Sequence, residues 1–194
     1  VPTYSVVRGS YNGGVWMESL RYLENIGTDQ APRFVNMESD SFFSAGRALT
    51  TKKANIHFGR VPGYNSFLSQ LDTSCRAYPT AVDWNRDGAT DFIIGTHDGY
   101  VYFAENDGEA TDLVFKKPVK LKGVRTDSDA APFVVDWDGD GHPDLVLGSG
   151  NGEVVLYRNN GKNKLKLAGT FTAGGQALSV AGAAAPAAAD SGMP

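Results

Sequence analysis

The feature that most constrains this chain is an internal repeat. Residues 83–91 return 53 residues later as residues 136–144, and the match continues without a gap to Gly108 and Gly161, with ten of the 26 aligned positions identical. A period of about 50 residues indicates similar supersecondary units, each of which buries its apolar face against the next. The 194 residues are therefore best interpreted unit by unit.

Each unit is expected to consist of short β-strands. Residues 133–135, 145–147 and 154–157 are apolar runs of strand length, rich in β-branched and aromatic side chains. The turns Asp98-Gly99 and Asn151-Gly152 separate such runs in the two units. These dipeptides are strong hairpin signals, because both turn positions need a positive φ.

A fourth strand is predicted near residues 113–115 in the first unit and near 165–167 in the second. Four short antiparallel strands in about 50 residues make a propeller blade. The predicted fold class is therefore all-β, with β-propeller blades of four short antiparallel strands and about three blades' worth of sequence. A closed ring needs at least four blades, so we expect a part of a larger propeller, one completed by other subunits, or an open curved stack.

The repeat divides the chain into five predicted segments. They are a partial blade at 1–34, an insertion at 35–76, a blade with a calcium loop at 77–128, a second such blade at 129–182, and a last segment at 183–194. The last segment is either the start of a next repeat or a strand that closes the first blade, because residues 186–190 echo residues 132–136. Residues 191–194 supply no further carboxylates.

Both repeated segments have the ligand spacing of a calcium loop. Ca²⁺ takes six to eight oxygen ligands, which alternating side chains and one backbone carbonyl can supply. The predicted ligands are Asp83, Asn85, Asp87, Ala89 and Asp91 at the first site and Asp136, Asp138, Asp140, His142 and Asp144 at the second, where Ala89 and His142 would contribute their carbonyl oxygens. The glycine after the third ligand permits a sharp bend around the ion. The expected cofactor is Ca²⁺, at two sites.

Three other interpretations of these loops are weaker. An EF-hand needs a bidentate Glu at position 12, but Ile94 and Leu147 stand there, inside apolar runs. Asp, Asn and Gly are also common in turns that hold no metal. Two loops with matched ligands at a fixed offset favour a metal, and Mg²⁺ is the lesser alternative because it demands near-ideal octahedral geometry.

The two metal loops, the apolar strand after each and the turns that end at Gly108 and Gly161 resemble the FG-GAP and VCBS class of calcium-binding propeller repeats, found in integrin α-subunits and some fungal lectins. Residues 25–34 resemble the closing part of such a repeat. The resemblance implies propeller blades and bound calcium, and it identifies no ligand. The first unit lacks its metal loop, and residues 36–76 have no counterpart in the family.

Composition excludes several other classes of protein. Hydrophobic residues at 41% and charged residues at 21% are typical of a globular chain rather than a disordered one. No apolar run approaches the roughly 20 residues of a membrane span. Lys and Arg are scattered and the net charge is −4, so no nucleic-acid partner is expected. Cys75 is the single cysteine, which excludes a disulfide within this sequence.

No catalytic constellation emerges from the spacing of the polar residues. His97 lies in a hairpin turn beside Asp98, and His142 lies inside a metal loop. Trp84 and Trp137 follow the first ligand of each loop, and we expect them to pack between neighbouring blades because a structural residue must recur in every unit.

These observations predict a non-catalytic, calcium-stabilised propeller module that binds a protein or glycan ligand. An extracellular or secreted location is expected, with the cell surface, periplasm or an organelle lumen included, because short loops of modest affinity fill best at millimolar calcium. One alternative is a structural subunit of a larger extracellular assembly or filament. Another is the propeller part of a polysaccharide-degrading enzyme, whose catalytic residues would have to lie within residues 36–76.

Overall fold

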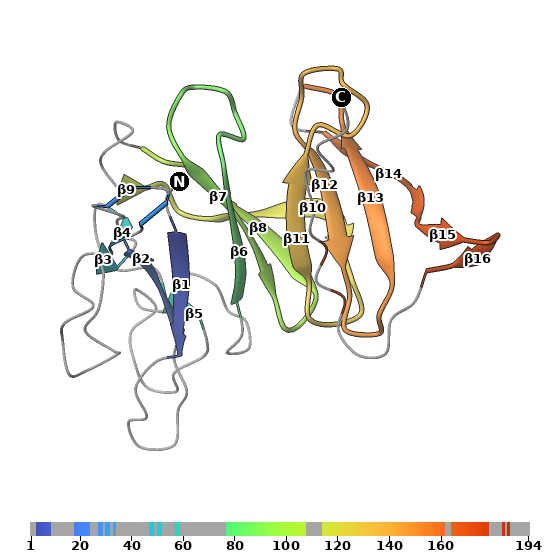
Figure 1. The fold of residues 1–194 in the computed structure, drawn as a ribbon, viewed down its shortest axis with the longest axis horizontal. Helices are drawn as coiled ribbons and strands as arrows, with labels where there is room; N and C mark the ends of the chain where they lie inside the picture. The colour runs from blue at the N-terminus through green and yellow to red at the C-terminus, as the bar shows by residue number, and fades with distance from the viewer. Residues whose placement is uncertain are drawn as a thin grey trace.

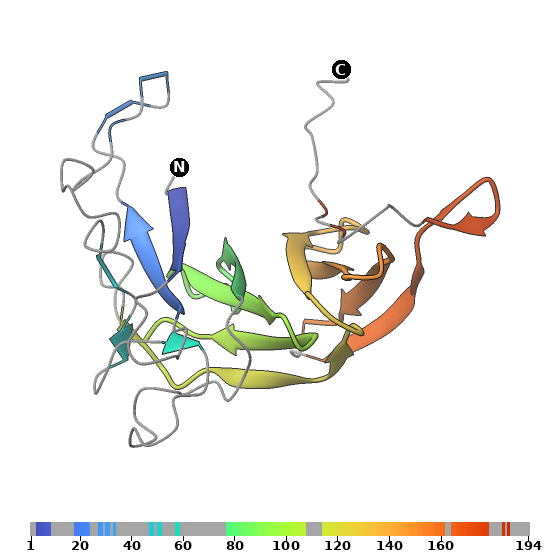
Figure 2. The ribbon, with the colours of Figure 1, turned by 90° about the horizontal axis from the view of Figure 1, so that it is seen from below.

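A computed structural model describes residues 3–8, 18–23, 27–28, 30–31, 33, 47–48, 50–51, 57–58, 77–107, 114–161, 164–178, 184 and 186. These residues form strands and turns, with no helix among them, so the predicted all-β fold class is confirmed. Three four-stranded sheets lie in a row, with the N-terminal sheet at one end (Figures 1 and 2), and two two-stranded sheets accompany them. No helix in this part of the chain is long and apolar enough to cross a membrane.

The first complete sheet, here the first blade, has four antiparallel strands. They run in the order β6 (Ala77–Val82), β7 (Asp91–Thr96), β8 (Tyr100–Ala104) and β10 (Val119–Arg125). Every residue of β7 is buried: β6 and β8 flank this strand, Ile93 belongs to the core shared with the next sheet, and Phe92 contacts Phe115. The hairpin between β7 and β8 turns at Gly99, whose φ of 83° confirms the predicted turn.

The second blade repeats this arrangement. Its strands are β11 (Ala131–Val135), β12 (Asp144–Gly148), β13 (Val154–Asn159) and β14 (Leu165–Thr170), paired antiparallel in chain order. β12 is buried throughout, as β7 is in the first blade. A small hairpin of β15 (Thr172–Ala173) and β16 (Gln176–Ala177) extends beyond the blade (Figure 1).

The fourth strand of the first blade lies later than the sequence predicted. β9 (Val114–Phe115) pairs in parallel with β4 (Thr50–Thr51), and β10 provides the outer strand instead. Phe115 is buried edge-on against Phe92, with ring centroids 5.5 Å apart, which holds β9 at the end of the blade. The prediction near 113–115 was therefore wrong, whereas the one near 165–167 is confirmed by β14.

The N-terminal sheet contains no counterpart of the innermost strand among the described residues. β1 (Thr3–Arg8) pairs with β2 (Glu18–Leu23), and β2 pairs on its other side with β3 (Arg47–Ala48) and β5 (His57–Phe58). In the sequence, Glu24, Asn25 and Gly27 repeat Glu105, Asn106 and Gly108, so β2 corresponds to β8 and the order β1-β2-β3 corresponds to β7-β8-β10 of the first blade. β3, β4 and β5 come from the predicted insertion at 35–76, and its other residues lie outside the described part of the chain.

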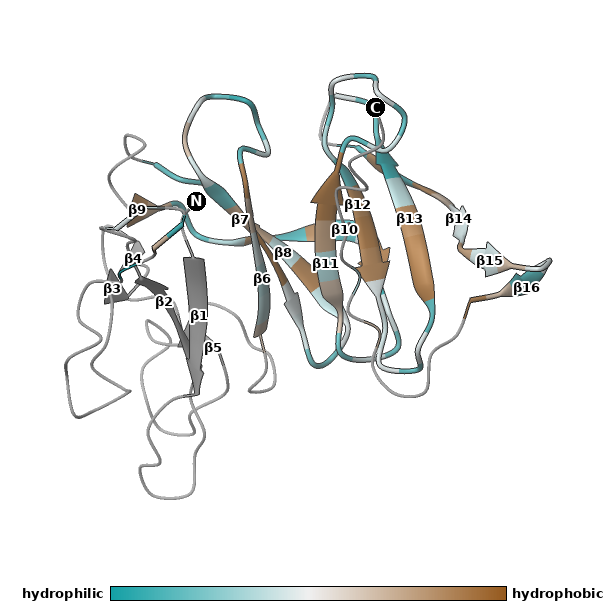
Figure 3. Cartoon of the chain, in the orientation of Figure 1, coloured by the Kyte–Doolittle hydropathy of each residue, from teal (hydrophilic) through white to brown (hydrophobic). Residues whose placement is uncertain are grey.

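The main apolar core lies between the two complete blades. Its buried members are Trp84, Ile93, Val101, Val124 and Ala130 from the first blade and its exit, with Leu145, Leu147 and Tyr157 from the second. A second cluster, of Val146, Val154, Leu156 and Ala184, lies on the other face of the second blade. The central strands are accordingly the most hydrophobic parts of the sheets (Figure 3).

The two blades meet at a backbone contact. Gly95 lies against Ala130, where a Cβ would overlap the Ala130 carbonyl oxygen. The Ala130 N–H donates to the Thr96 carbonyl, 3.0 Å from nitrogen to oxygen, just before β11 begins. The main chains of neighbouring blades are therefore in direct contact, with no side chain between them.

The same contact recurs on the far side of the second blade. A Cβ on Gly148 would overlap the carbonyl oxygen of Ala184, and the Ala184 N–H donates to the Ser149 carbonyl at 2.9 Å. Pro186 also lies against Gly148, as Pro132 lies against Gly95. Ala184 and Pro186 thus occupy the positions that Ala130 and Pro132 have at the entry to β11.

Candidate metal centre

The first loop, residues 83–90, joins β6 to β7 and is organised by its own carboxylates. The Asp83 carboxylate accepts the N–H groups of Asp87 and Gly88, each at 3.0 Å. The Ala89 N–H donates to Asp87 at 2.8 Å. Gly88 has a φ of 90°, which permits the bend after the third ligand position. Asp83 and Asp87 therefore hold the loop in a tight turn.

The second loop, residues 136–143, joins β11 to β12 at the same end of the molecule (Figure 1). Asp136 accepts N–H groups from Gly139, Asp140 and Gly141 at 2.9 to 3.1 Å. The His142 N–H donates to Asp140 at 2.8 Å. The two loops therefore share three hydrogen bonds: the first aspartate accepts two N–H groups and the aspartate at the third ligand position accepts one.

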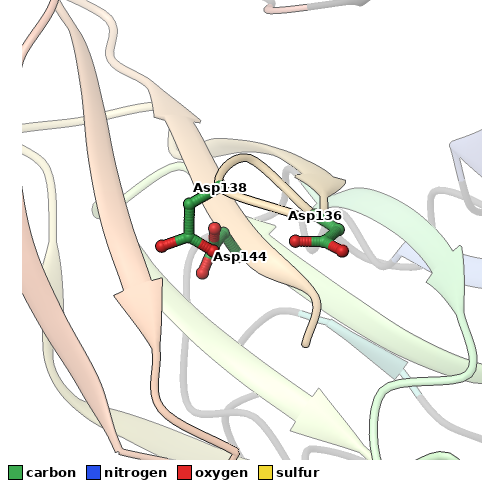
Figure 4. A group of neighbouring side chains, drawn as sticks. All are labelled: Asp136, Asp138 and Asp144. Carbon is green, nitrogen blue, oxygen red and sulfur yellow. The ribbon is translucent and has the colours of Figure 1, made fainter. Parts of the chain in front are cut away.

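Three carboxylates of the second loop converge. Oxygens of Asp136, Asp138 and Asp144 lie within 4.8 Å of one another, and Figure 4 shows the three side chains. Clustered carboxylate oxygens are the ligands that Ca²⁺ prefers. Three of the five predicted ligands of this site are thus brought together, and the group could hold a metal ion.

The other two predicted ligands of the second site, Asp140 and His142, lie outside this group. The His142 imidazole lies against Gly161 in the turn after β13, where a Cβ on Gly161 would overlap the ring. The ring is therefore not part of the cluster, and the ligand roles of Asp140 and of the His142 carbonyl stay predictions.

The first loop differs at its second ligand position, where Asn85 replaces an aspartate. Asn85 donates from Nδ2 to Asp87 at 2.7 Å and accepts the Asp87 N–H at 3.1 Å. The N–H of Ala89 and the amide of Asn85 hold the pKa of Asp87 below its ordinary value. The first site, with Asp83, Asn85, Asp87, Ala89 and Asp91 as ligands, stays a prediction.

Asp91, the last predicted ligand of the first loop, also holds the blade together. Its carboxylate is fully buried and accepts the N–H groups of Trp84 at 3.1 Å and Asn106 at 2.8 Å. Burial raises the pKa of Asp91 to about 6, and these N–H donors oppose the shift. A cation beside this carboxylate would stabilise its charged form.

Asp144 makes the same contacts in the second blade. It is fully buried and accepts the N–H groups of Trp137 at 3.1 Å and Asn159 at 2.8 Å. Each oxygen thus binds one backbone donor, so the carboxylate ties the start of the metal loop to the end of β13. An amide at this position could accept from only one of the two donors.

Asp144→Asn should therefore destabilise the protein even in excess chelator, when no metal contributes. One buried N–H would face an amide NH₂ group, at a cost of roughly 1–3 kcal/mol in the free energy of unfolding. Urea denaturation with chelator present measures the loss. Asp127→Asn, at an exposed aspartate outside both loops, is the matched control. Equal stabilities for the two variants would contradict this role of Asp144.

Asn106 and Asn159 have a structural role that was not predicted from the sequence. Both are buried, and their side-chain amides donate to the carbonyls of Thr90 at 3.3 Å and Pro143 at 3.1 Å. They stand at the same position of the repeat. Their recurrence there could have indicated a structural role from the sequence alone. They fix the end of each metal loop to the turn after the third strand.

A charge reversal beside the loops was also not predicted. Arg158 forms an ion pair with Asp138, whereas its counterpart Glu105 accepts from the Asn85 amide at 3.4 Å. Lys116 neutralises Glu105 at 2.7 Å. The charge at this position of the repeat thus matches the loop residue that it contacts: the acid Glu105 contacts the amide of Asn85, and the base Arg158 contacts the carboxylate of Asp138.

The remaining candidates lie elsewhere in the blades. His97 lies at the opposite end of β7, with Nδ1 2.6 Å from an oxygen of Asp129. Trp84 is 2% exposed in the core between the blades, which confirms its predicted packing role. Trp137 contacts Phe171 edge-on at 5.0 Å but remains 49% exposed.

A family model described as FG-GAP-like repeat matches the chain twice, over residues 83–147 and 136–191. The matches contain both metal loops and cover more than half of the chain. No curated protein and no solved structure matches it.

Proposed function

Because this chain belongs to the FG-GAP-like repeat family, we propose that it is a non-catalytic, calcium-stabilised propeller module that binds a protein or glycan ligand outside the cytosol. The predicted resemblance to this family of propeller blades is confirmed by the two matches. The class of ligand, the absence of catalysis and the location are what we propose in addition to the family assignment.

Calcium at the loops is supported by the chemistry of the donors. Asp136, Asp138 and Asp144 present clustered oxygens on a loop whose backbone is already folded around them. Such preorganised oxygen sites suit Ca²⁺ better than the softer metals, which prefer sulfur or imidazole. Short loops of modest affinity are best filled at millimolar calcium, which supports a location outside the cytosol.

The ligand site that we propose is the shallow groove between the two loops. Asp83, Arg86 and Asp87 line it from the first loop, and Asp136 and Gly141 line it from the second. Both calcium sites thus border the same groove, and this observation carries the proposal. A bound ion would fix the shape of each wall, so ligand binding should depend on calcium.

Arg86 is the side chain most suited to ligand contact in this groove. It is exposed and has a φ of 65°, where the second loop has Gly139 with a φ of 72°. Its guanidinium lies near Gly141, across the groove. An arginine offers five donors in a fixed fork, which suits the carboxylate and hydroxyl oxygens of a glycan or of an acidic peptide.

Arg86→Ala should weaken calcium-dependent binding to an array of immobilised acidic and neutral oligosaccharides and acidic peptides by roughly tenfold or more, the value of one good charged hydrogen bond. Lys122→Ala, at an exposed cation on β10, is the control and should bind as the parent does. Ligand binding that does not depend on calcium, or an equal loss of affinity in both variants, would overturn the assignment of the ligand site to this groove. Release of products from polysaccharides in the same samples would overturn the non-catalytic role.

A further inference from the structure

A cavity lies at the end of the two blades that is opposite the metal loops. It has a volume of about 510 Å³, and it is lined by residues 125–127 of the first blade and its exit and by the hairpin between β12 and β13, together with Leu167 of β14. The metal loops follow β6 and β11, whereas this hairpin follows β12, so the two sites lie at opposite ends of the blades (Figure 1). Cavities of roughly 300–1,000 Å³ are typical of sites for small ligands.

One residue of the cavity wall, Ser149, has a buried hydroxyl with no hydrogen-bond partner in the part of the chain that the structure describes. The residue is 4% exposed. At the same position of the first blade, the Thr96 hydroxyl lies 2.6 Å from the Asp98 carboxylate and 3.0 Å from the Tyr100 carbonyl oxygen. A buried polar group without a partner is destabilising, and a bound group that supplies the missing hydrogen bond explains its presence. Ser149 therefore indicates a ligand with a polar group.

Asn151 stands where the first blade has Asp98, and it contacts two acids instead of the hydroxyl. Its Nδ2 donates to the carboxylates of Asp127 at 3.3 Å and Glu153 at 3.1 Å. Its Oδ1 accepts the Glu153 N–H at 3.0 Å, which fixes the orientation of the amide. The two carboxylates thus converge on a single nitrogen.

These two carboxylates have no ion-pair partner among the described residues. Asp127 and Glu153 both line the cavity, together with Arg125. The Arg125 guanidinium lies 4.7 Å from the centroid of the Tyr100 ring, so its charge is placed against an aromatic ring rather than a carboxylate. The cavity wall therefore carries two carboxylates and one guanidinium, a combination that favours a cationic ligand.

Another part of the cavity wall is apolar. Val155 and Leu167 contribute aliphatic side chains, and Tyr157 is held in place by donating its hydroxyl to the Arg125 carbonyl at 3.4 Å. Leu167 is 56% exposed, which is unusual for a large hydrophobic side chain of these two blades. A ligand with an apolar stem would remove this surface from water.

We propose that this cavity binds a primary ammonium group on an apolar stem, the chemistry that a lysine side chain shares with a free alkyl amine. An ammonium has three donors and no acceptor, and the cavity offers it the carboxylates of Asp127 and Glu153 and the hydroxyl of Ser149. The stem would pack against Val155 and Leu167. A calcium ion would need six or more oxygens and would leave the apolar wall in water, so the ammonium is the better fit.

The test is isothermal titration calorimetry of the full chain, with calcium present, against Nα-acetyl-lysine amide, butylamine and Nα-acetyl-norleucine amide. Norleucine keeps the apolar stem of lysine and lacks its ammonium, so it should bind at least tenfold more weakly than the lysine derivative. Either order of affinity between the lysine derivative and butylamine supports the site and tells a peptide source from a free amine. Equal binding of the lysine and norleucine derivatives, or no binding of either amine, would overturn the proposal.

Glu153→Gln should weaken butylamine binding roughly tenfold, because it removes a charged hydrogen-bond acceptor. Glu105→Gln, at an acid beside the first metal loop, is the control and should bind butylamine as the parent does. Glu153→Gln should also keep the calcium-dependent binding to the array of oligosaccharides and peptides. The two sites can therefore fail separately.

Ser149→Ala should weaken butylamine binding roughly threefold or more without lowering stability to urea, because the hydroxyl it removes has no partner in the free protein. Thr96→Val, at the same position of the first blade, loses a hydroxyl that is hydrogen-bonded and should lower the urea midpoint. Equal losses of stability in the two variants would show that the Ser149 hydroxyl is already paired. That result, or butylamine binding unchanged by both Glu153→Gln and Ser149→Ala, would refute the site.

Discussion

Removal of calcium with a chelator should lower the melting temperature of this protein by roughly 10–20 °C. A site at a calcium concentration one hundred times its dissociation constant contributes about 2.7 kcal/mol of stability, so two sites contribute roughly 5 kcal/mol. For a chain of this length each kcal/mol shifts the melting temperature by about 2–4 °C. Without the ion, the carboxylates at each loop repel one another, and the fully buried Asp91 and Asp144 lose the cation that would stabilise their charged forms.

Single ligand variants separate the two sites. Asp87→Ala in the first loop and Asp140→Ala in the second should each lose about half of the calcium-dependent stabilisation, and the double variant should lose nearly all of it. Asp127→Ala, outside both loops, should respond to calcium as the parent does. Thermal scans with calcium and with chelator provide the comparison. If the chelator leaves the melting temperature of the parent protein unchanged, the calcium assignment is refuted.

Gly95→Val should destabilise the protein by about 4 kcal/mol or more, an exceptional value for one substitution. The new side chain would overlap the backbone of Ala130 and the ring of Pro132. The Ala130 N–H is bonded to the Thr96 carbonyl, so this segment cannot move without separating the two blades. Separation would expose the core between them to water.

The matched variant is Gly148→Val, at the same position of the second blade. The three atoms nearest its new Cβ belong to Ala184 and Pro186, and the main core lies on the opposite face of the blade. We expect its cost to be below half that of Gly95→Val, as measured by urea denaturation of dilute samples. Similar costs for the two variants would indicate that local strain in the strand, rather than separation of the blades, explains the loss.

The repeat alone predicted the all-β fold, the two four-stranded sheets and the positions of the metal loops. The repeat is informative because the same pattern occurs twice. In each unit, metal-ligand residues at alternate positions are followed by an apolar strand, and few folds other than stacked sheets can bury that strand. The same period located the glycines of both loops, and Gly88 and Gly141 have the positive φ expected of a sharp bend.

The features that were missed depend on contacts between units. The outer strand of the first blade begins at Val119 rather than near 113, because Phe115 is held against Phe92 from another strand. The ion pair of Arg158 with Asp138 joins residues 20 positions apart, and neither has a matched charge in the first blade. The local sequence pattern does not predict such contacts between residues that are distant in the chain.

The different exposure of Trp84 and Trp137 was also not predictable from the local sequence. Their sequence contexts are nearly identical, but one is buried and the other half exposed. Burial here depends on whether another sheet follows in space, which a repeat can suggest but cannot specify.

The glycine contact between blades has a consequence for how such arrays change in evolution. At Gly95 the spacing of the two blades is set by main-chain atoms, which every amino-acid sequence shares. Substitutions elsewhere on the facing surfaces can accumulate without altering the pitch of the stack. Whole units can then be gained, lost or exchanged while the curvature of the remainder is preserved.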